Sequence, residues 1–229
     1  MIEKVNKFPE VYPDFPEVAA LCVYPNFAET VKEQLKSNNI KIAVVSGVFP
    51  SSQSFEEVKI LESSIAVHKG ANEVDIVLSL NHFLSGNTEK AKSEISAIKK
   101  AIGSAHLKVI LESGLLSDEE LIYKASMLSL EAGADFIKTS TGKTEPAATP
   151  EAAVVMCRAI SDFHKRTGKK RGFKPAGGIV TKADAIKYYA IVDTILGEEW
   201  LTPELFRLGA SRLANNLLSD YYKTSIKYF

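Results

Sequence analysis

Two lysines stand in the middle of short apolar stretches, where a charged side chain is unusual. Lys138 lies in residues 135–143, DFIKTSTGK, and Lys174 lies in residues 172–178, GFKPAGG. Each stretch begins as an apolar strand and ends at glycine. A strand buried on both faces normally excludes lysine, because an unpaired ammonium group is costly in a low-dielectric interior. The spacing of 36 residues fits neighbouring parallel strands joined by one helix.

If these two lysines face each other, each raises the energetic cost of protonating the other, and burial lowers a lysine pKa in the same direction. A lysine that is neutral at physiological pH is a nucleophile that can form a Schiff base with a carbonyl compound. A single lysine near a strand end more often extends to solvent or forms a salt bridge. Two matched patterns of strand, lysine and glycine favour the chemical interpretation.

Composition limits the class of protein. The chain has 229 residues and no net charge, which predicts one domain over 1–229 and neither a nucleic-acid nor a membrane partner. Cys22 and Cys157 lie far apart, so we expect a reducing compartment, the cytoplasm, and no disulfide framework. The four histidines show no metal-ligand spacing, which predicts no metal site.

Strand and helix patterns alternate along the whole chain. The expected strands are residues 19–24, 41–46, 73–78, 107–111, 136–140, 173–176 and 192–196. The expected helices are residues 28–37, 54–69, 88–102, 117–132, 149–168, 181–190 and a last one that opens at 209–211. This alternation predicts an α/β fold with one parallel sheet, either an open doubly wound sheet or a closed (β/α)₈ barrel. No Gly-x-Gly-x-x-Gly pattern follows the first strand, which disfavours a dinucleotide-binding sheet.

Residues 136–143 and 172–178 resemble the signature segments of deoxyribose-phosphate aldolase, a family of class I aldolases on a TIM barrel. The resemblance extends through residues 21–25, 73–77, 108–112 and 206–211. It implies a TIM (β/α)₈-type barrel that reversibly cleaves 2-deoxy-D-ribose 5-phosphate to glyceraldehyde 3-phosphate and acetaldehyde. The ligand implied is therefore a sugar phosphate, handled without a metal or organic cofactor, in deoxyribonucleotide catabolism.

The resemblance also implies roles for individual residues. Lys138 matches the Schiff-base lysine, Lys174 the lysine that perturbs it, and Asp75 the carboxylate of the proton relay. The segments that hold the substrate phosphate are matched by Gly142, Lys143, Gly177, Gly178 and Ser211. Cys22 and Thr139 match positions that line the pocket.

The residues themselves support part of this assignment. Asp75 lies between Val74 and Ile76 in an apolar strand, where a carboxylate needs a partner. A salt bridge to Lys174 would satisfy it and is compatible with proton transfer through a water molecule. TIM barrels often bind phosphate at the loops after their last two strands, on backbone N–H groups and a helix N-terminus. Glu112, at a strand end, is expected either to line the pocket or to orient Lys138.

The N-terminal stretch departs from the family pattern. Nothing here matches the family's first strand, and residues 2–8 resemble only the last turns of the helix that follows it. We therefore expect seven strands with a gap, residues 1–17 as a helix remnant or irregular segment, and Met1 as an internal methionine. The unpaired edges would favour a homodimer. Residues 221–229 are expected to form a flexible tail.

Two other functions are compatible with the sequence. One is a different phosphate-binding barrel enzyme, such as a sugar-phosphate isomerase or a transaldolase-like enzyme. The other is a truncated barrel that binds phosphorylated ligands without turnover. An isomerase would use a glutamate base and form no imine, so trapping of an imine separates it from an aldolase.

Overall fold

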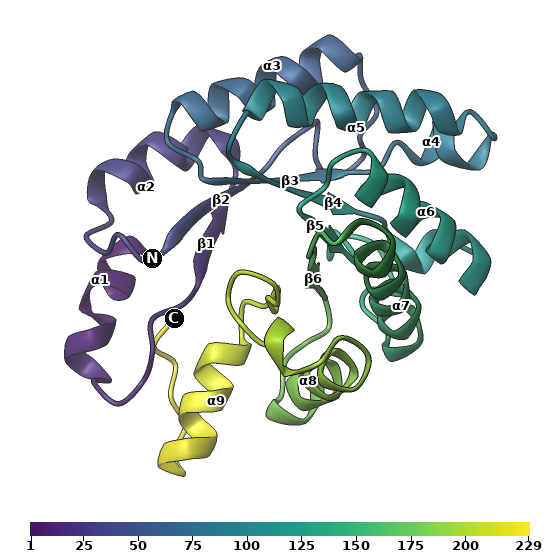
Figure 1. Ribbon diagram of the computed structural model, residues 1–229. Coiled ribbons are helices and arrows are strands. Elements are labelled where there is room, and N and C mark those ends of the chain that lie inside the picture. The colour runs from purple at the N-terminus through teal and green to yellow at the C-terminus, as the bar shows by residue number, and fades with distance from the viewer.

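The computed structural model describes all residues, 1–229, and contains one sheet of six parallel strands in sequential order. The strands are β1 (Ala20–Val23), β2 (Lys41–Val45), β3 (Glu73–Val77), β4 (His106–Ile110), β5 (Phe136–Lys138) and β6 (Gly172–Lys174). The sheet curls, and its helices cover the outer face (Figure 1). The fold is therefore a curled half-barrel of the α/β class, in agreement with the predicted TIM-type architecture.

Nine α-helices accompany these strands, and the first of them precedes β1. They are α1 (Ile2–Val11), α2 (Ala28–Gln34), α3 (Glu56–His68), α4 (Leu80–Leu84), α5 (Thr88–Ile102), α6 (Glu119–Glu131), α7 (Pro150–Thr167), α8 (Lys182–Leu196) and α9 (Leu213–Tyr222). Short 3₁₀ turns occupy Pro25–Phe27, Ser113–Leu115 and Glu198–Trp200. None of the helices combines the length and the apolar character needed to cross a lipid bilayer.

Helix caps explain where several helices begin. Thr149 caps α7 by accepting a hydrogen bond from the N–H of Ala152, and Thr181 with Asp184 forms the predicted capping box of α8. The sequence also predicts a capping box of Ser117 and Glu120 for the helix over 117–132, and this prediction is wrong. Asp118 caps α6 instead, because its carboxylate accepts from the N–H of Leu121 while the Ser117 hydroxyl donates to that carboxylate.

The last predicted strand, residues 192–196, is also wrong. These residues form the end of α8, where Tyr188, Val192 and Leu196 are buried at intervals of four along one helix face. Their β-branched composition favours a strand, but packing of this face against α7 overrides that weak preference. The sheet therefore has six strands, not seven.

A short extended segment after α8 lies beside β6, where a seventh strand would pair with the sheet. Phe206 and Gly209 form isolated parallel bridges with Phe173 and Ala176. The N–H of Phe173 donates to the carbonyl of Leu205 at 2.8 Å, and the N–H of Gly209 donates to the carbonyl of Pro175 at 2.9 Å. We call residues 205–209 the seam segment, because it continues the sheet beyond β6 without forming a full strand.

The barrel does not close between the seam segment and β1. β1 pairs in parallel with β2, and no strand pairs with its other edge. The N-terminal residues form helix α1, as the expectation of a helix remnant allowed, and the helix continues past Pro9 to Val11. The first and last parts of the chain lie on this open side, with both termini beside β1 (Figure 1).

Aromatic side chains join α1 to the C-terminal residues on the open side. We call this group the aromatic clasp; it consists of Phe8, Tyr12, Phe15, Tyr221, Tyr222, Tyr228 and Phe229. The Phe8 ring lies 5.4 Å from that of Phe229, and the Tyr228 hydroxyl donates to the carbonyl of Lys4 at 2.7 Å. The tail, expected to be flexible, instead packs against α1.

Helix α3 shows its apolar residues to solvent. Val58, Leu61 and Ile65 recur at helical spacing, which is why the sequence predicts a helix over 54–69, yet each is about half exposed. The buried face carries Lys59, whose ammonium group binds both carboxylate oxygens of Glu94 at 2.9 Å. The helix forms as predicted, but a buried ion pair lies where an apolar face would be expected.

Candidate active site

Alternation along the strands divides the sheet into an apolar outer face and a polar inner face. Outward side chains such as Val74, Val109 and Ile137 join one core of 38 buried residues beneath the helices. The inward positions of β3 to β6 carry ionisable side chains instead. The register pairs Ile110 with Lys138, and Lys138 with Lys174, so the two lysines stand side by side.

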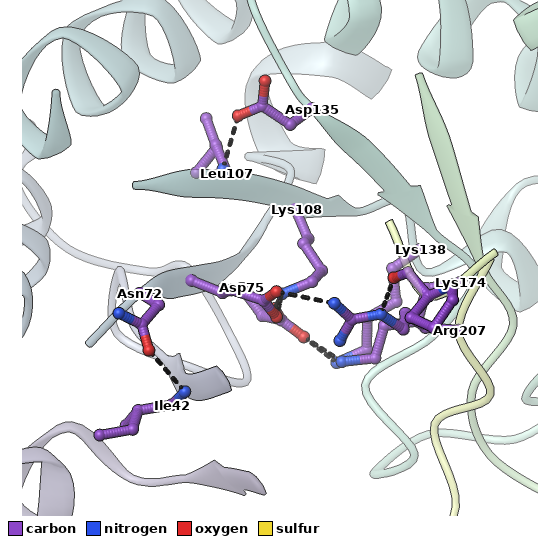
Figure 2. A network of polar contacts seen from close by, with 11 residues as sticks. Ile42, Asn72, Asp75, Leu107, Lys108, Asp135, Lys138, Lys174 and Arg207 are labelled. Atoms are coloured by element: carbon purple, nitrogen blue, oxygen red, sulfur yellow. Dashed lines mark hydrogen bonds and ion pairs between the residues drawn. The ribbon is translucent and has the colours of Figure 1, made fainter. Parts of the chain in front are cut away.

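Asp75 is the point where these side chains meet. Its Oδ2 accepts from Lys174 Nζ at 2.7 Å and from Lys138 Nζ at 3.0 Å. Asp75 is completely buried, and both lysines are less than a tenth exposed. Figure 2 shows the lysines converging on this carboxylate from neighbouring strands. The three residues assigned to the chemistry by sequence are thus brought together.

A third lysine, which the sequence interpretation did not assign to the site, lies on the other side of Asp75. Lys108 Nζ donates to Asp75 Oδ1 at 2.9 Å and to Glu73 Oε2 at 2.6 Å. The second oxygen of Glu73 accepts from Arg207 of the seam segment at 3.0 Å. Lys108 stands mid-strand among apolar residues, so the pattern that identified Lys138 and Lys174 would have identified it too.

Burial and neighbouring charges set the protonation of this cluster. Burial is the largest influence and lowers the pKa of Lys138; Asp75 opposes it and Lys174 adds to it. Burial is also the largest influence on Lys174 and favours its neutral form, but the surrounding negative groups, Asp75 first and Glu73 among them, together outweigh it and raise the pKa of Lys174. Burial would raise the pKa of Asp75, yet Lys108, Lys138 and Lys174 together hold it well below its ordinary value. The arrangement therefore makes Lys138 lose its proton more readily than Lys174.

The two predicted pocket-lining residues differ in their placement. Cys22 lies on the open side and shares with Lys174 the lining of a cavity of about 460 Å³ between β1 and the seam segment. Thr139 faces away from the interior, because it follows the inward-facing Lys138 on β5. Its hydroxyl donates to the carbonyl of Ala176 and accepts from the N–H of the same residue. Thr139 therefore ties the ends of β5 and β6 together and does not line the pocket.

Four of the five predicted phosphate-binding residues come from two adjoining loops at the carboxyl ends of β5 and β6. Gly142, Gly177 and Gly178 all have positive φ angles, and a Cβ at Gly177 would lie 3.4 Å from the Cα of Gly142. Lys143 is exposed and forms no ion pair within the chain. Left-handed turns can present backbone N–H groups to an anion. The N–H of Lys143 already donates to the Thr141 hydroxyl, whereas those of Gly142 and Gly178 form no hydrogen bond within the chain.

Ser211, the fifth, lies two residues beyond Gly209, whose carbonyl accepts from the N–H of Gly177 at 3.4 Å. It is exposed just before α9 and borders a cavity of about 320 Å³ with Leu21 and Ala214. Ser211 is thus connected to the two glycine loops through the seam segment, but it stands on the open side.

Glu112 positions a loop and does not touch Lys138. Its backbone is left-handed, with φ of 49°, which is uncommon for a residue other than glycine. Its carboxylate accepts from the N–H of Thr141 at 3.0 Å and from the Thr141 hydroxyl at 2.5 Å. Glu112 therefore holds the turn that presents Gly142 and Lys143.

Two hydroxyl groups near the carboxyl ends of β4 and β5 have no hydrogen-bond partner. Ser113 and Ser140 are buried, and neither Oγ forms a hydrogen bond within the protein. Ser140 follows Lys138 by two residues, so alternation puts it on the inner face. Buried polar groups are normally paired, which marks this hydroxyl as a group that a ligand could satisfy. No cluster of three His, Cys, Asp or Glu side chains is arranged to hold a metal ion.

Fold and site together define an α/β-barrel protein with a buried, carboxylate-linked lysine pair at the inner face of its sheet. Comparison with known proteins agrees. Residues 12–192 match the profile of the DeoC/LacD family aldolases, and the chain belongs to this family.

Relatives with the same name, deoxyribose-phosphate aldolase, match most of the chain. The chain is 45% identical over 206 residues to the deoxyribose-phosphate aldolase of Homo sapiens, covering 89% of this chain and 65% of that protein. The enzyme of Mus musculus is 44% identical over 206 residues, with the same coverage. The chain thus spans slightly less than two thirds of the length of these relatives.

Solved structures resemble the fold. A structure described as "QR15, an Aldolase" superposes with a TM-score of 0.75 at 28% identity, covering 96% of this chain and 89% of that one. The deoxyribose phosphate aldolase of Aeropyrum pernix, described as tetrameric, gives a TM-score of 0.72 at 26% identity, covering 98% and 86% of the two chains.

Proposed function

We propose that this protein is a class I aldolase that reversibly cleaves 2-deoxy-D-ribose 5-phosphate to glyceraldehyde 3-phosphate and acetaldehyde. The observation that carries the proposal is the buried Lys138, which shares one carboxylate oxygen with Lys174. Family membership and the names of the relatives support the same reaction. The lysine itself supplies the electron sink, so the reaction requires no added cofactor.

In the proposed mechanism, the neutral Nζ of Lys138 attacks C1 of the open-chain aldehyde. Loss of water from this adduct gives a protonated imine. A base then removes the proton of the C3 hydroxyl, the C2–C3 bond breaks, and its electrons pass into the imine to give an enamine. Glyceraldehyde 3-phosphate leaves. Protonation of the enamine at C2 and hydrolysis of the resulting imine release acetaldehyde and restore Lys138.

The proton transfers are assigned to Lys174 and a water molecule bound to it, with Asp75 in a supporting role. The strongly lowered pKa of Asp75 makes it a weak base, so we assign it the task of holding Lys174 and keeping it protonated. Lys174 then stands 2.7 Å from an ionised carboxylate and can pass a proton through a bound water molecule. The unpartnered hydroxyl of Ser140 would bind a polar group of the substrate on the same face.

The two glycine loops and Lys143 are assigned to the substrate phosphate, with Ser211 completing the site. Their position at the carboxyl ends of β5 and β6 supports this assignment, because TIM barrels bind phosphate at this edge. Glu112 contributes indirectly by holding Thr141. Binding energy from a phosphate remote from the reacting bond assists the chemical step.

The test is reductive trapping. Borohydride added with the sugar phosphate should reduce the imine and add the corresponding mass to the peptide that contains Lys138. The Lys138→Leu variant is the matched control and should remain unlabelled. Labelling of another residue in the wild-type protein, or none in folded protein, would refute the aldolase mechanism and favour an isomerase or a chain that binds phosphorylated ligands without turnover.

A second comparison tests the phosphate site. Deoxyribose without its phosphate should react far more slowly than the 5-phosphate, by about a hundredfold or more in kcat/KM. Lys143→Ala should reduce this preference. Equal efficiency on both sugars in the wild-type protein would remove the phosphate assignment while leaving the lysine chemistry intact.

We also propose a cytoplasmic location and a homodimer for this protein. Both cysteines are unpaired, which supports a cytoplasmic location. The free edge of β1 supports a homodimer, because an unpaired parallel edge invites association. Light scattering across a range of protein concentrations tests the dimer.

A further inference from the structure

Lys108 is a buried cation that the proposed reaction does not use. It is completely buried, and its ammonium group contacts Glu73 and Asp75 at 2.6 and 2.9 Å. The Phe136 ring centre lies 5.9 Å from its Nζ. A buried lysine destabilises a fold unless its charge is compensated, and here two carboxylates compensate one ammonium group. Such a costly arrangement suggests that Lys108 has a role beyond packing.

The charged groups around Lys108 come from four places. β3 contributes Glu73 and Asp75, β5 contributes Lys138, β6 contributes Lys174, and the seam segment contributes Arg207. At the amino-terminal mouth of the sheet, Lys41, His106 and Glu204 line a cavity of about 280 Å³ together with Glu73 and Arg207. From the open side, the Cys22 thiol lies near Lys138 and Lys174.

The inner groups form one chain of contacts from Arg207 through Glu73, Lys108 and Asp75 to the lysine pair. Figure 2 shows Arg207, Lys108, Asp75 and the two lysines of this chain. Arg207 and Lys108 carry one positive charge each, and Glu73 and Asp75 carry one negative charge each. These four groups therefore balance. Without Lys108, one negative charge would be left over, and it could be balanced by a second proton on the lysine pair.

We propose that Lys108 is a positioning residue that neutralises one oxygen of Asp75 and thereby allows the Lys138–Lys174 pair to hold one proton instead of two. Lys108 does not touch the substrate in this scheme. It acts through Asp75, from the side opposite the reacting lysine. The inference rests on the proposed function only in that a neutral Lys138 is what imine formation needs.

The direct readout is the protonation of Lys138, measured without turnover. Acetic anhydride modifies only neutral amines, so the extent of labelling of the Lys138 peptide against pH gives the titration midpoint. Lys108→Met removes the charge and keeps an apolar chain of similar length. The titration midpoint of Lys138 should move upward by about one pH unit or more. Removing the positive charge of Lys108 beside Asp75 makes a proton on Lys138 less costly.

Glu73→Gln provides the opposite charge change at the other end of the chain of contacts. It removes a negative charge and retains an oxygen that accepts from Arg207. The midpoint of Lys138 should move downward, by less than in the first variant because Glu73 is more distant. In the double variant, Lys108→Met with Glu73→Gln, the net charge is that of the wild type, and the midpoint should return at least halfway.

These outcomes separate charge balance from a purely structural role. If Lys108 only orients Asp75, Lys108→Met lowers trapping and turnover at every pH with an unmoved midpoint, and the double variant rescues nothing; either result overturns the proposal. If Lys108→Met fails to fold, Glu73→Gln alone decides by the direction of its shift, and an unshifted midpoint overturns the proposal. Failure of the proposed function appears separately, as absence of borohydride trapping on Lys138 in the wild-type protein.

Discussion

The two sides of this half-barrel are held together by different interactions. From β2 to β6 a continuous parallel ladder is reinforced inside by ion pairs among Glu73, Asp75 and the lysines. Between the seam segment and β1 no strands pair, and the aromatic clasp makes the connection. Asp75, Lys138 and Lys174 stand on the laddered side, so their geometry is set by strands that do not depend on closure of the barrel.

Asp75→Asn should produce the largest loss of stability, because it leaves three buried lysines, at least two of them charged, without their shared carboxylate. Removing one partner of a buried ion pair costs about 3–5 kcal/mol. Urea denaturation should show a decrease of that size in the free energy of unfolding. Asp162→Asn, at an exposed position on α7, is the control and should change it by less than about 0.5 kcal/mol. Similar losses in both variants would contradict the importance of the inner network.

The stability difference between the wild type and Asp75→Asn should also depend on pH. The folded-state pKa of Asp75 lies well below its ordinary value of 3.8, so its contribution is present above that value and is lost as pH falls through the folded pKa. The stability difference between wild type and Asp75→Asn should therefore be steady above about pH 5 and shrink at lower pH.

Phe8→Ala tests the open side. Phe8 is buried and its ring packs against those of Tyr12, Tyr228 and Phe229. Truncating a buried phenylalanine costs about 3 kcal/mol. Thermal and urea unfolding should show this loss, whereas the pH midpoint for labelling of Lys138 should not move. Tyr189→Ala, at a half-exposed ring on α8, is the control. A shifted midpoint in Phe8→Ala would show that the two sides are coupled.

Lys174→Leu tests the laddered side without removing the nucleophile. Loss of the neighbouring ammonium group removes a repulsion and leaves Asp75 free for Lys138, so both effects raise the pKa of Lys138. The pH at which imine formation becomes efficient should rise by about one unit. Trapping measured across pH 6–10 follows it. An unchanged profile would mean that Lys174 does not perturb Lys138.

A glycine-to-alanine substitution on each side adds one methyl group and tests how rigid that side is. A Cβ at Gly172 would stand 2.2 Å from the Phe136 ring, and one at Gly209 would stand 2.7 Å from the Cβ of Ala176. Overpacking typically costs about 1–3 kcal/mol. Gly172→Ala should be the more damaging, because Phe136 is enclosed whereas the seam segment can move toward the open side. The reverse order, measured by urea denaturation, would mean that the seam segment is as rigid as the ladder.

The sequence alone determined the class of fold and much of the site. Alternating strands and helices indicate one parallel sheet, and a lysine in an apolar strand is informative because burial of a charge is so costly. Lys138, Lys174 and Asp75 were found in this way and through the resemblance. The glycine-rich turns after β5 and β6 were identified through the resemblance, and their positive φ angles explain why glycine stands there.

Only the tertiary structure decided which partners these residues have. Residues 192–196 favour a strand locally, but they complete a helix because one face packs on α7. Thr139 lies in a conspicuous motif, yet strand alternation turns it outward. The sequence pattern of a lysine in an apolar strand could have identified Lys108. Its position between Glu73 and Asp75, however, depends on the register of neighbouring strands. Contacts between residues distant in the chain depend on packing of the whole sheet, which no local pattern encodes.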